Sequence, residues 1–412
     1  MRILFGSKAI KMVERLSVRG SKPSVEPRVR KILKEVHKTG DRALRRYAER
    51  WDGLSKSQSL QVSAEEMIAA WNKLPAEVRG AMGLAAENIR RYCEWQMPRS
   101  WTRTHRGICL GQLAIPLDAV GCYVPGGRYP LVSTLLMTVI PAQVAGVRTI
   151  RVVSPNPSAE VFAAARMLGV GELYRVGGAQ AIGALAYGTQ TIGRVDKIVG
   201  PGNAYVTAAK KLISFDCAID FLAGPTEALV LSESGDPRFI AADLISQAEH
   251  DPEALCVFIT TNGKLAEAVQ VNTKKLAREN ATAKQSLRRQ GVILVAGSRE
   301  QARQWANAVA PEHITVARED VRYIRNAGSV FVGEYSPQSA GDYASGPNHV
   351  LPTAGQARFR GGLSVMDFIK LVTVQELSLA GLKQIGKTVE TLAHIEGLQA
   401  HAKSVRVRYA DA

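Results

Sequence analysis

Between residues 119 and 333, short runs rich in β-branched residues alternate with longer stretches whose apolar residues recur at helical spacing. Regular alternation of strand and helix signals is typical of parallel sheets with covering helices. The runs are apolar at nearly every position, as expected for strands buried on both faces of a sheet. The expected strands are AVGCYV (119–124), TIRVVSP (149–155), ELYRVGG (172–178), KIVGPG (197–202), ALVLS (228–232), CVFITT (256–261), VILVA (292–296), HITVA (313–317) and SVFVG (329–333).

Helical segments flank these strand runs. Residues 24–95 and the segment after 360 carry apolar residues at three- and four-residue spacing, and VRVRY (405–409) reads as a short strand or tail. A chain of 412 residues is longer than one hydrophobic core usually supports. We therefore predict an α/β fold with two Rossmann-like parallel-sheet domains and helical N- and C-terminal extensions. The expected division is an N-terminal arm at 1–19, a first α/β domain at 20–122 with 228–363, a second at 123–227, and a C-terminal helical region at 364–412.

The formal net charge of +16 requires a nucleic-acid partner to be considered, because a clustered basic face attracts phosphate. The densest basic segments, 28–38 and 44–50, are interrupted by apolar residues at helical spacing, which is typical of solvated helix faces. No zinc-finger spacing occurs, and the few aromatic residues do not alternate with the basic ones. Nucleic-acid binding is therefore the weaker interpretation, and we expect no such partner.

The cysteines and the hydropathy pattern favour a cytoplasmic protein without a membrane partner. The cysteines form no CxxC pair and are odd in number, which fits buried thiols in a reducing compartment. The N-terminal segment has no apolar core of signal-peptide length. The most apolar stretch, 131–147, is interrupted by polar residues and is too short to span a bilayer. The cysteines are Cys93, Cys109, Cys122, Cys217 and Cys256.

Two short motifs carry candidate chemistry. His250 ends the helix-like segment FIAADLISQAEH, and Gln247, three residues earlier, shares its helix face. The pair could supply two metal ligands, although the same spacing occurs on ordinary exposed helices. Glu312 and His313 open the run HITVA, at the lip of a strand, where an α/β enzyme can place acid–base groups. The alternative is a polar pair at a strand edge.

The segment SAGDYASGPNHVLPT (339–353) combines glycines and prolines, which forbid regular structure, with apolar residues that favour burial. A structured loop that holds Asp342 and His349 in fixed positions is consistent with a functional role, and a packed Ω-loop is the alternative. Near the C-terminus, Glu396 and His401 look like exposed helix residues when each is considered alone.

Three glycine-bearing turns directly follow predicted strands: VPGG (124–127), VGGAQAIG (176–183) and VGPGNAYVT (199–207). The last two lead into a helix, whose free N–H groups can bind a phosphate. The usual GxGxxG fingerprint is absent. Together, the three turns predict a nucleotide site.

Taken in order, these motifs are similar to those of the histidinol dehydrogenase family from about residue 20 to 410. The resemblance implies a homodimeric, NAD-dependent oxidoreductase that converts L-histidinol through L-histidinal to L-histidine, the last steps of histidine biosynthesis. The segments that carry it are YVPGG, GGAQAIGALAYGT, KIVGPGNAYVTAAK, AGPTEALV, DLISQAEH, APEH, SAGDYASG with NHVLPT, and EGLQAHAKS.

The resemblance also implies the site residues. His313 would be the base that removes the hydroxyl proton, and Glu312 would activate the water that adds to the aldehyde. The first α/β domain would carry the metal and catalytic residues, the second would bind NAD, and the C-terminal region would reach into the partner subunit's site. One Zn²⁺ per subunit would be held by Gln247, His250, Asp342 and His401 of the partner subunit. Matching positions for NAD are Tyr123, Gln180 and Asn203, and those for the substrate are Thr226, Gln247, His250, His313, Asp342, His349, Glu396 and His401.

The chain departs from the family pattern at two places near these residues. The usual GPSE reads GPTE, so that Thr226 replaces a Ser, and Pro347 removes an N–H donor from the 339–353 loop. The alternative function is therefore oxidation of another primary alcohol, such as sulfopropanediol, by a zinc and NAD dehydrogenase of the same fold. Glu396 favours histidinol, because a carboxylate suits a protonated imidazole and would repel a sulfonate.

Overall fold

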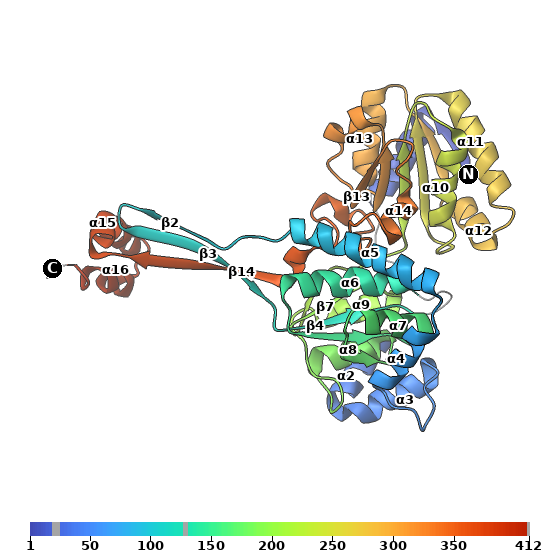
Figure 1. Ribbon diagram of the computed structural model, residues 1–412. Coiled ribbons are helices and arrows are strands. Elements are labelled where there is room, and N and C mark those ends of the chain that lie inside the picture. Colours follow the sequence, from blue (N-terminus) through green and yellow to red (C-terminus); the bar gives the residue numbers. More distant parts are fainter. Residues whose placement is uncertain (19–24, 127–130, 410–412) are drawn as a thin grey trace.

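The computed structural model describes residues 1–18, 25–126 and 131–409. Two parallel sheets dominate it (Figure 1). The first sheet has six strands in the order β1-β11-β10-β9-β12-β13, and every neighbouring pair is parallel. Its strands are β1 (Arg2–Phe5), β9 (Glu227–Leu231), β10 (Leu255–Thr260), β11 (Val292–Val295), β12 (His313–Val316) and β13 (Ser329–Val332).

The second sheet has five parallel strands in the order β6-β5-β4-β7-β8. All nine strand runs predicted from the sequence form strands in these two sheets, which confirms the α/β fold with two parallel sheets. The short edge strand β8 was not predicted. The strands are β4 (Ala119–Tyr123), β5 (Thr149–Val153), β6 (Glu172–Tyr174), β7 (Lys197–Val199) and β8 (Ala218–Ile219).

Helices cover both faces of each sheet, which explains why the strands are apolar on both sides. On the first sheet, one core contains residues of α1 (Gly6–Ser17) and α13 (Arg299–Val309). The opposite core contains residues of α10 (Pro237–Ala248), α11 (Gly263–Leu276) and α12 (Ala281–Arg289). On one face of the second sheet, the core contains residues of α2 (Glu26–Thr39), α3 (Asp41–Trp51), α8 (Gly178–Tyr187) and α9 (Ala204–Ile213). On the other face, the core contains residues of α4 (Ala64–Lys73), α5 (Ala76–Trp95), α6 (Val132–Ala145) and α7 (Ala159–Met167).

The N-terminal segment differs from the predicted arm at 1–19. Residues 2–5 form β1, which pairs with β11 at the edge of the first sheet. Helix α1 buries Ala9, Val13 and Leu16 against the core of that sheet. The amphipathic spacing of these residues is the reason that the segment packs rather than extends.

The segment 20–122 also differs from the expected division. We assigned it to the unit of the first sheet, but its described helices α2 to α5 contribute to the cores of the second sheet. The expected boundary at 122/123 falls inside β4, which runs from Ala119 to Tyr123. Sequence periodicity shows that a helix has an apolar face, but it does not show which sheet that face covers.

A third sheet, which the sequence did not predict, is antiparallel and forms an arm. It has the order β14-β3-β2, with β2 (Trp101–His105), β3 (Ile108–Pro116) and β14 (Ile369–Leu377). Figure 1 shows this ribbon leading away from the body, with α15 (Leu379–Ile395) and α16 (Gln399–Arg406) at its far end. The prediction of helix throughout the segment after 360 was therefore wrong for β14, and the predicted VRVRY strand begins within α16.

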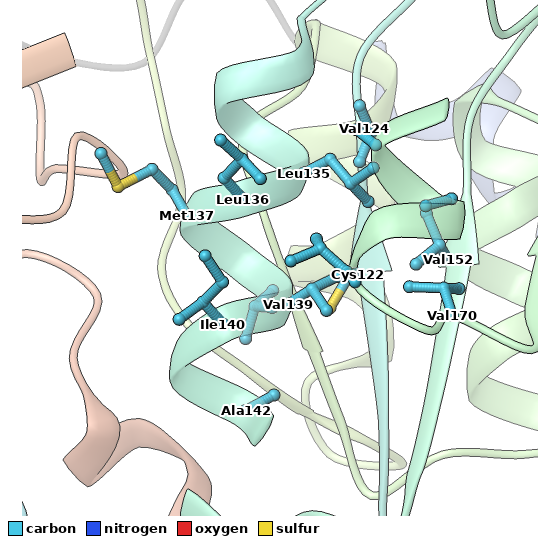
Figure 2. Packing of buried hydrophobic residues seen from close by; sticks show 14 of the residues in the cluster. Cys122, Val124, Leu135, Leu136, Met137, Val139, Ile140, Ala142, Val152 and Val170 are labelled. Carbon is cyan, nitrogen blue, oxygen red and sulfur yellow. The ribbon is translucent and has the colours of Figure 1, made fainter. Parts of the chain in front are cut away.

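Helix α6 lies in the interior and packs against β4, α5 and α7. Its residues are apolar around nearly the whole circumference, which is expected of a helix that has no solvent face. Figure 2 shows Leu135 and Val139 of this helix beside Cys122 and Val152 of the second sheet. The helix therefore provides a rigid support for the residues that follow β4.

The cysteines are unbridged, and four of them are buried, as the sequence indicated. Burial raises the pKa of Cys93 to about 11 and those of Cys122, Cys217 and Cys256 to about 12. These thiols therefore pack as small apolar groups. None of the helices within the described residues has the length and apolar character needed to cross a membrane.

We predict that Lys210→Met destabilises the protein by about 3–5 kcal/mol, because it leaves the buried carboxylate of Asp220 without its cation. Lys210 and Asp220 form an ion pair between side chains that are 3% and 1% exposed. Urea unfolding followed by circular dichroism would measure the effect. Lys211→Met is the matched control, because the adjacent Lys211 pairs with Glu26 at the surface and should change stability by about 0.5 kcal/mol or less. Equal losses in the two variants would contradict the prediction.

Candidate functional site

Glu312 and His313 lie at the amino end of β12, beside the amino end of β9. The register pairs His313 with Ala228, so that the start of β12 lies against residues 226–228. Glu312 Oε2 accepts hydrogen bonds from Thr226 Oγ1 at 2.6 Å and from the Glu227 backbone N–H at 2.9 Å. Most open α/β sheets bind ligands at the carboxyl ends of their strands, and the first sheet places this acid–base pair at the opposite end.

The imidazole of His313 is buried and held on several sides. Its Nδ1 lies 3.3 Å from the carbonyl oxygen of Glu227 and 3.7 Å from Glu312 Oε2. Its ring stacks on Phe331 of β13, with centroids 5.9 Å apart. A carbonyl oxygen can only accept, so Nδ1 carries a proton when it binds Glu227. Nε2 faces another acceptor, Asp342 Oδ1, and is the nitrogen that gains or loses the second proton.

Burial changes the protonation of this pair. Desolvation raises the pKa of Glu312 to about 7, although the neighbouring His313 and the hydrogen bonds from Thr226 and Glu227 oppose it. For His313, desolvation lowers the pKa, but the charge of Glu312 and the hydrogen bond with Asp342 outweigh it, so that the pKa is raised. A carboxyl group with a pKa of about 7, in contact with an imidazole whose pKa is raised, can exchange protons with a substrate.

Asp342 and Gln247 extend the same cluster. Asp342 lies on α14 (Gln338–Tyr343), and its Oδ1 is 3.4 Å from His313 Nε2. Gln247 lies in the last turn of α10 and donates from Nε2 to Asp342 Oδ2 at 3.1 Å. Desolvation raises the pKa of Asp342. The hydrogen bond with His313 and the charges of His313, His349 and His250 together lower it by more, so the pKa lies below its ordinary value. His250 is exposed and lies three residues after Gln247.

His349 connects the cluster to the second half of the molecule. Its Nδ1 hydrogen-bonds to the Asp342 carbonyl oxygen at 2.7 Å, and its Nε2 lies 3.4 Å from Thr134 Oγ1 in the first turn of α6. The neighbouring Asn348 donates to the carbonyl oxygen of Met137 at 2.6 Å. Burial lowers the pKa of His349. The 339–353 segment is therefore an ordered bridge between α14 and α6.

The structure does not bring Glu396 and His401 to this cluster. Glu396 lies in the linker after α15, and His401 lies in α16. Both residues are exposed, and the two helices lie at the end of the arm (Figure 1). The nine residues of β14 alone extend over about 30 Å at the usual rise of a strand. Within one chain, the predicted metal and substrate residues therefore form an incomplete set.

The donor atoms of the cluster fit a metal such as zinc in their chemistry. Gln247 and Asp342 place amide and carboxylate atoms side by side, and His250 lies in the turn just after the end of α10. Oxygen and imidazole nitrogen are suitable ligands for Zn²⁺, and catalytic zinc sites keep a position for a further ligand. Across the described residues, no group of three or more His, Cys, Asp or Glu side chains is arranged to hold a metal ion.

The predicted nucleotide residues gather at the carboxyl edge of the second sheet. Strands β5 and β6 lie on one side of β4, and β7 and β8 lie on the other, so that the topological switch point falls between β4 and β7. Tyr123 ends β4, and Asn203 follows β7 as the N-cap of α9. Gln180 lies in the first turn of α8 and is buried. This edge is where the fold predicts a dinucleotide, so the residues present fit NAD.

Two acidic residues of these sites were not found from the sequence. Glu227 starts β9, and its backbone contacts both Glu312 and His313, while its Oε1 accepts a hydrogen bond from the Ala354 N–H at 2.8 Å. Asp52 accepts hydrogen bonds from Gly177 and Gln180 at the second sheet. The only sequence signal for Glu227 is its place in the GPTE motif. Asp52 has none, because its partners lie more than a hundred residues away.

Comparison with known proteins gives one consistent family. A family model described as histidinol dehydrogenase matches residues 17–409. The histidinol dehydrogenase of Methanothermobacter thermautotrophicus is 47% identical over 92% of either chain, and that of Methanosarcina mazei is 44% identical over 96% of this chain and 95% of its own. The crystal structure of histidinol dehydrogenase from Elizabethkingia anophelis superposes with a TM-score of 0.94 at 35% identity, and it covers 99% of this chain and 98% of its own.

We predict that Glu312→Gln removes a pH-dependent loss of stability. A carboxyl group whose pKa rises from 4.5 in the unfolded chain to about 7 in the fold binds a proton more tightly when folded. Its contribution to stability therefore falls as the pH rises between these two values. Relative to the unchanged protein, the variant should gain stability steadily from pH 4.5 to pH 7. Urea unfolding of metal-depleted protein across this range would measure it, and parallel pH profiles would contradict it.

Proposed function

The chain belongs to the histidinol dehydrogenase family, and we propose that it oxidises L-histidinol through L-histidinal to L-histidine with NAD, the last steps of histidine biosynthesis. The observation that carries this proposal is the buried contact of Glu312, His313 and Asp342 at the amino ends of β9 and β12. This cluster joins Glu312, whose pKa is raised to about 7, and the imidazole of His313 to a carboxylate and an amide that can bind a metal.

In the first oxidation, His313 is the base. Its Nδ1 faces the Glu227 carbonyl oxygen, so that Nε2 accepts the proton of the substrate hydroxyl. When bound, NAD would supply the acceptor for the hydride that the carbinol carbon loses. Stacking on Phe331 keeps the imidazole in place while its charge changes. A neutral imidazole is suited to this step because its ordinary pKa lies close to physiological pH.

In the second oxidation, Glu312 acts on water. When ionised, it accepts a proton from a water molecule that adds to the aldehyde carbon, which gives the hydrated aldehyde. Loss of a second hydride and a proton from the hydrate then yields the acid. The pKa of about 7 keeps both protonation states of Glu312 accessible, so it can accept a proton and release it again.

We propose that Gln247, His250 and Asp342 hold one Zn²⁺ per subunit together with His401 of the partner subunit. When bound, the metal supplies positive charge that orients the substrate's amino and hydroxyl groups. Thr226 supports this arrangement, because its hydroxyl lies 3.0 Å from Gln247 Oε1 and 2.6 Å from Glu312 Oε2. It therefore connects the metal residues to the acid–base residues. The other proposed substrate contacts are His349 and Glu396 of the partner subunit.

We also propose that NAD binds at Tyr123, Gln180 and Asn203 on the second sheet, opposite the catalytic cluster on the first. The bridge at His349 supports this division of roles between the two sheets, because it joins the Asp342 segment to the helix that follows β4. The active form would be a homodimer in which each arm completes the other subunit's site. The unbridged thiols support a cytoplasmic location.

The assignment of the two catalytic roles predicts opposite effects on the two half-reactions. His313→Ala should slow oxidation of histidinol far more than oxidation of supplied histidinal, because the aldehyde no longer needs its hydroxyl proton removed. Glu312→Gln should slow the water-dependent step most. Losses of about 10²–10⁴-fold are expected for removal of a general acid or base. Formation of NADH from each substrate would be measured separately. Small and equal effects on both substrates would show that the pair is structural.

The shared site predicts complementation between two inactive variants. His401→Ala and His313→Ala should each be nearly inactive. Mixed in equal amounts after dissociation and reassociation, they should form hybrids in which one site lacks both groups and the other is intact. Random pairing makes about half of the dimers hybrid with one good site in two, so roughly a quarter of the activity should return. Confirmed hybrids that stay inactive would place His401 outside the partner's site.

A further inference from the structure

Asp52 is a buried carboxylate that reaches the second sheet from a distant part of the chain. It caps the C-terminus of α3 and is 8% exposed. Its Oδ2 accepts hydrogen bonds from the Gly177 backbone N–H at 3.0 Å and from Gln180 Nε2 at 3.1 Å. Both partners belong to the glycine-bearing turn between β6 and α8. Asp52 therefore braces a turn that the proposed function assigns to NAD.

The backbone donors of this turn are already occupied. Gly177 donates to Asp52, and Gly178 donates to the hydroxyl oxygen of Tyr123 at 3.0 Å. We expected this turn to present free N–H groups to a phosphate. Instead, a protein carboxylate lies at the N-terminal end of α8, where an anionic ligand would otherwise be stabilised. For these two glycines, the phosphate prediction was wrong.

The same contact determines the orientation of Gln180. A carboxylate accepts hydrogen bonds but cannot donate them, so it selects the Nε2 end of the amide. The Oε1 end then lies beside Gly178, where an added Cβ atom would come within 2.8 Å of it. Gly178 has a φ of +60°, which glycine adopts without strain. The turn thus places an acceptor oxygen directly against Gly178, where any side chain would displace it.

We propose that Asp52 is a positioning residue of the dinucleotide site, which orients Gln180 so that its Oε1 accepts a hydrogen bond from a hydroxyl or amide group of the cofactor. This inference rests on the proposed NAD function and adds the chemistry of one contact. A phosphate oxygen is unsuited to this position, because it is an acceptor and would face both Oε1 and the charge of Asp52. Tyr123, the second proposed NAD residue, belongs to the same network through Gly178.

Asp52→Asn tests the proposal with NAD itself as the probe. Purified full-length protein would be titrated with NAD by calorimetry in the absence of histidinol. The amide can donate as well as accept, so it no longer selects one orientation of Gln180. We expect the dissociation constant for NAD to rise by about 2- to 10-fold, the range for loss of a hydrogen bond between neutral groups. The KM for histidinol should change by about twofold or less, because its proposed site lies on the other sheet.

Asp41→Asn is the matched control. Asp41 starts the same helix α3 and braces the loop after α8, where it bonds to the hydroxyl of Thr191 at 2.5 Å. Its loss should lower the melting temperature as much as Asp52→Asn does, yet leave NAD binding unchanged. A merely structural brace would instead give the two variants the same NAD affinity.

Three further results decide the outcome. If Asp52→Asn does not fold, Asp52→Glu takes its place, because it keeps the charge but displaces it by one methylene and should still weaken NAD binding. Unchanged NAD affinity in whichever of these variants folds would overturn the proposal, while the NAD function of the unchanged protein stands. If the unchanged protein itself binds no NAD, both the proposed function and this inference are wrong.

Discussion

The candidate active site depends on the pairing of β9 with β12. These strands are distant in sequence and adjacent in the sheet, and their register places residues 226–228 against Glu312 and His313. The backbone of Glu227 then serves both groups, since its N–H binds the carboxylate and its carbonyl oxygen binds the imidazole. Because strand pairing is cooperative with the whole sheet, the geometry of the acid–base pair is as rigid as the core beneath it. The side chain of Glu227 extends this control to the segment after His349 through Ala354.

The parts of this fold that the sequence predicted are those with a local physical signature. Strands buried on both faces read as apolar runs, and all nine were placed correctly. The antiparallel arm lacks that signature, because β14 is exposed along most of its length and its mixed residues resemble a helix surface. Strand β1 is only four residues long and gains its stability from β11, which lies far away in sequence. The grouping of Gln247, Glu312, His313 and Asp342 was predicted through family motifs, since spacing alone left each of them ambiguous.

Contacts between distant segments account for what was missed at the two sites. Asp52 is an ordinary residue after a helix until the fold brings it beneath the α8 turn, and Glu227 is one acidic residue in a strand until its neighbours are known. The glycine-bearing turns also show that contacts between distant segments are not visible in the local sequence. The sequence correctly indicated turns after β6 and β7, while the VPGG turn extends beyond the described residues at Gly127. It did not indicate that the N–H groups of Gly177 and Gly178 bind Asp52 and Tyr123. Local sequence predicts backbone shape, and tertiary contacts determine which polar groups remain available.

The arm has a consequence for how the activity of the protein depends on its concentration. It presents apolar side chains such as Leu113, Leu371 and Val372 to water and carries His401 far from the cluster of its own chain. In the proposed assembly, an isolated chain lacks one metal ligand, so two chains must meet before either can work. Mass action then makes the turnover of each molecule depend on how many others surround it. On dilution below the dissociation constant of this assembly, activity would fall with the square of the protein concentration, because each working site would need one β-ribbon from a second chain.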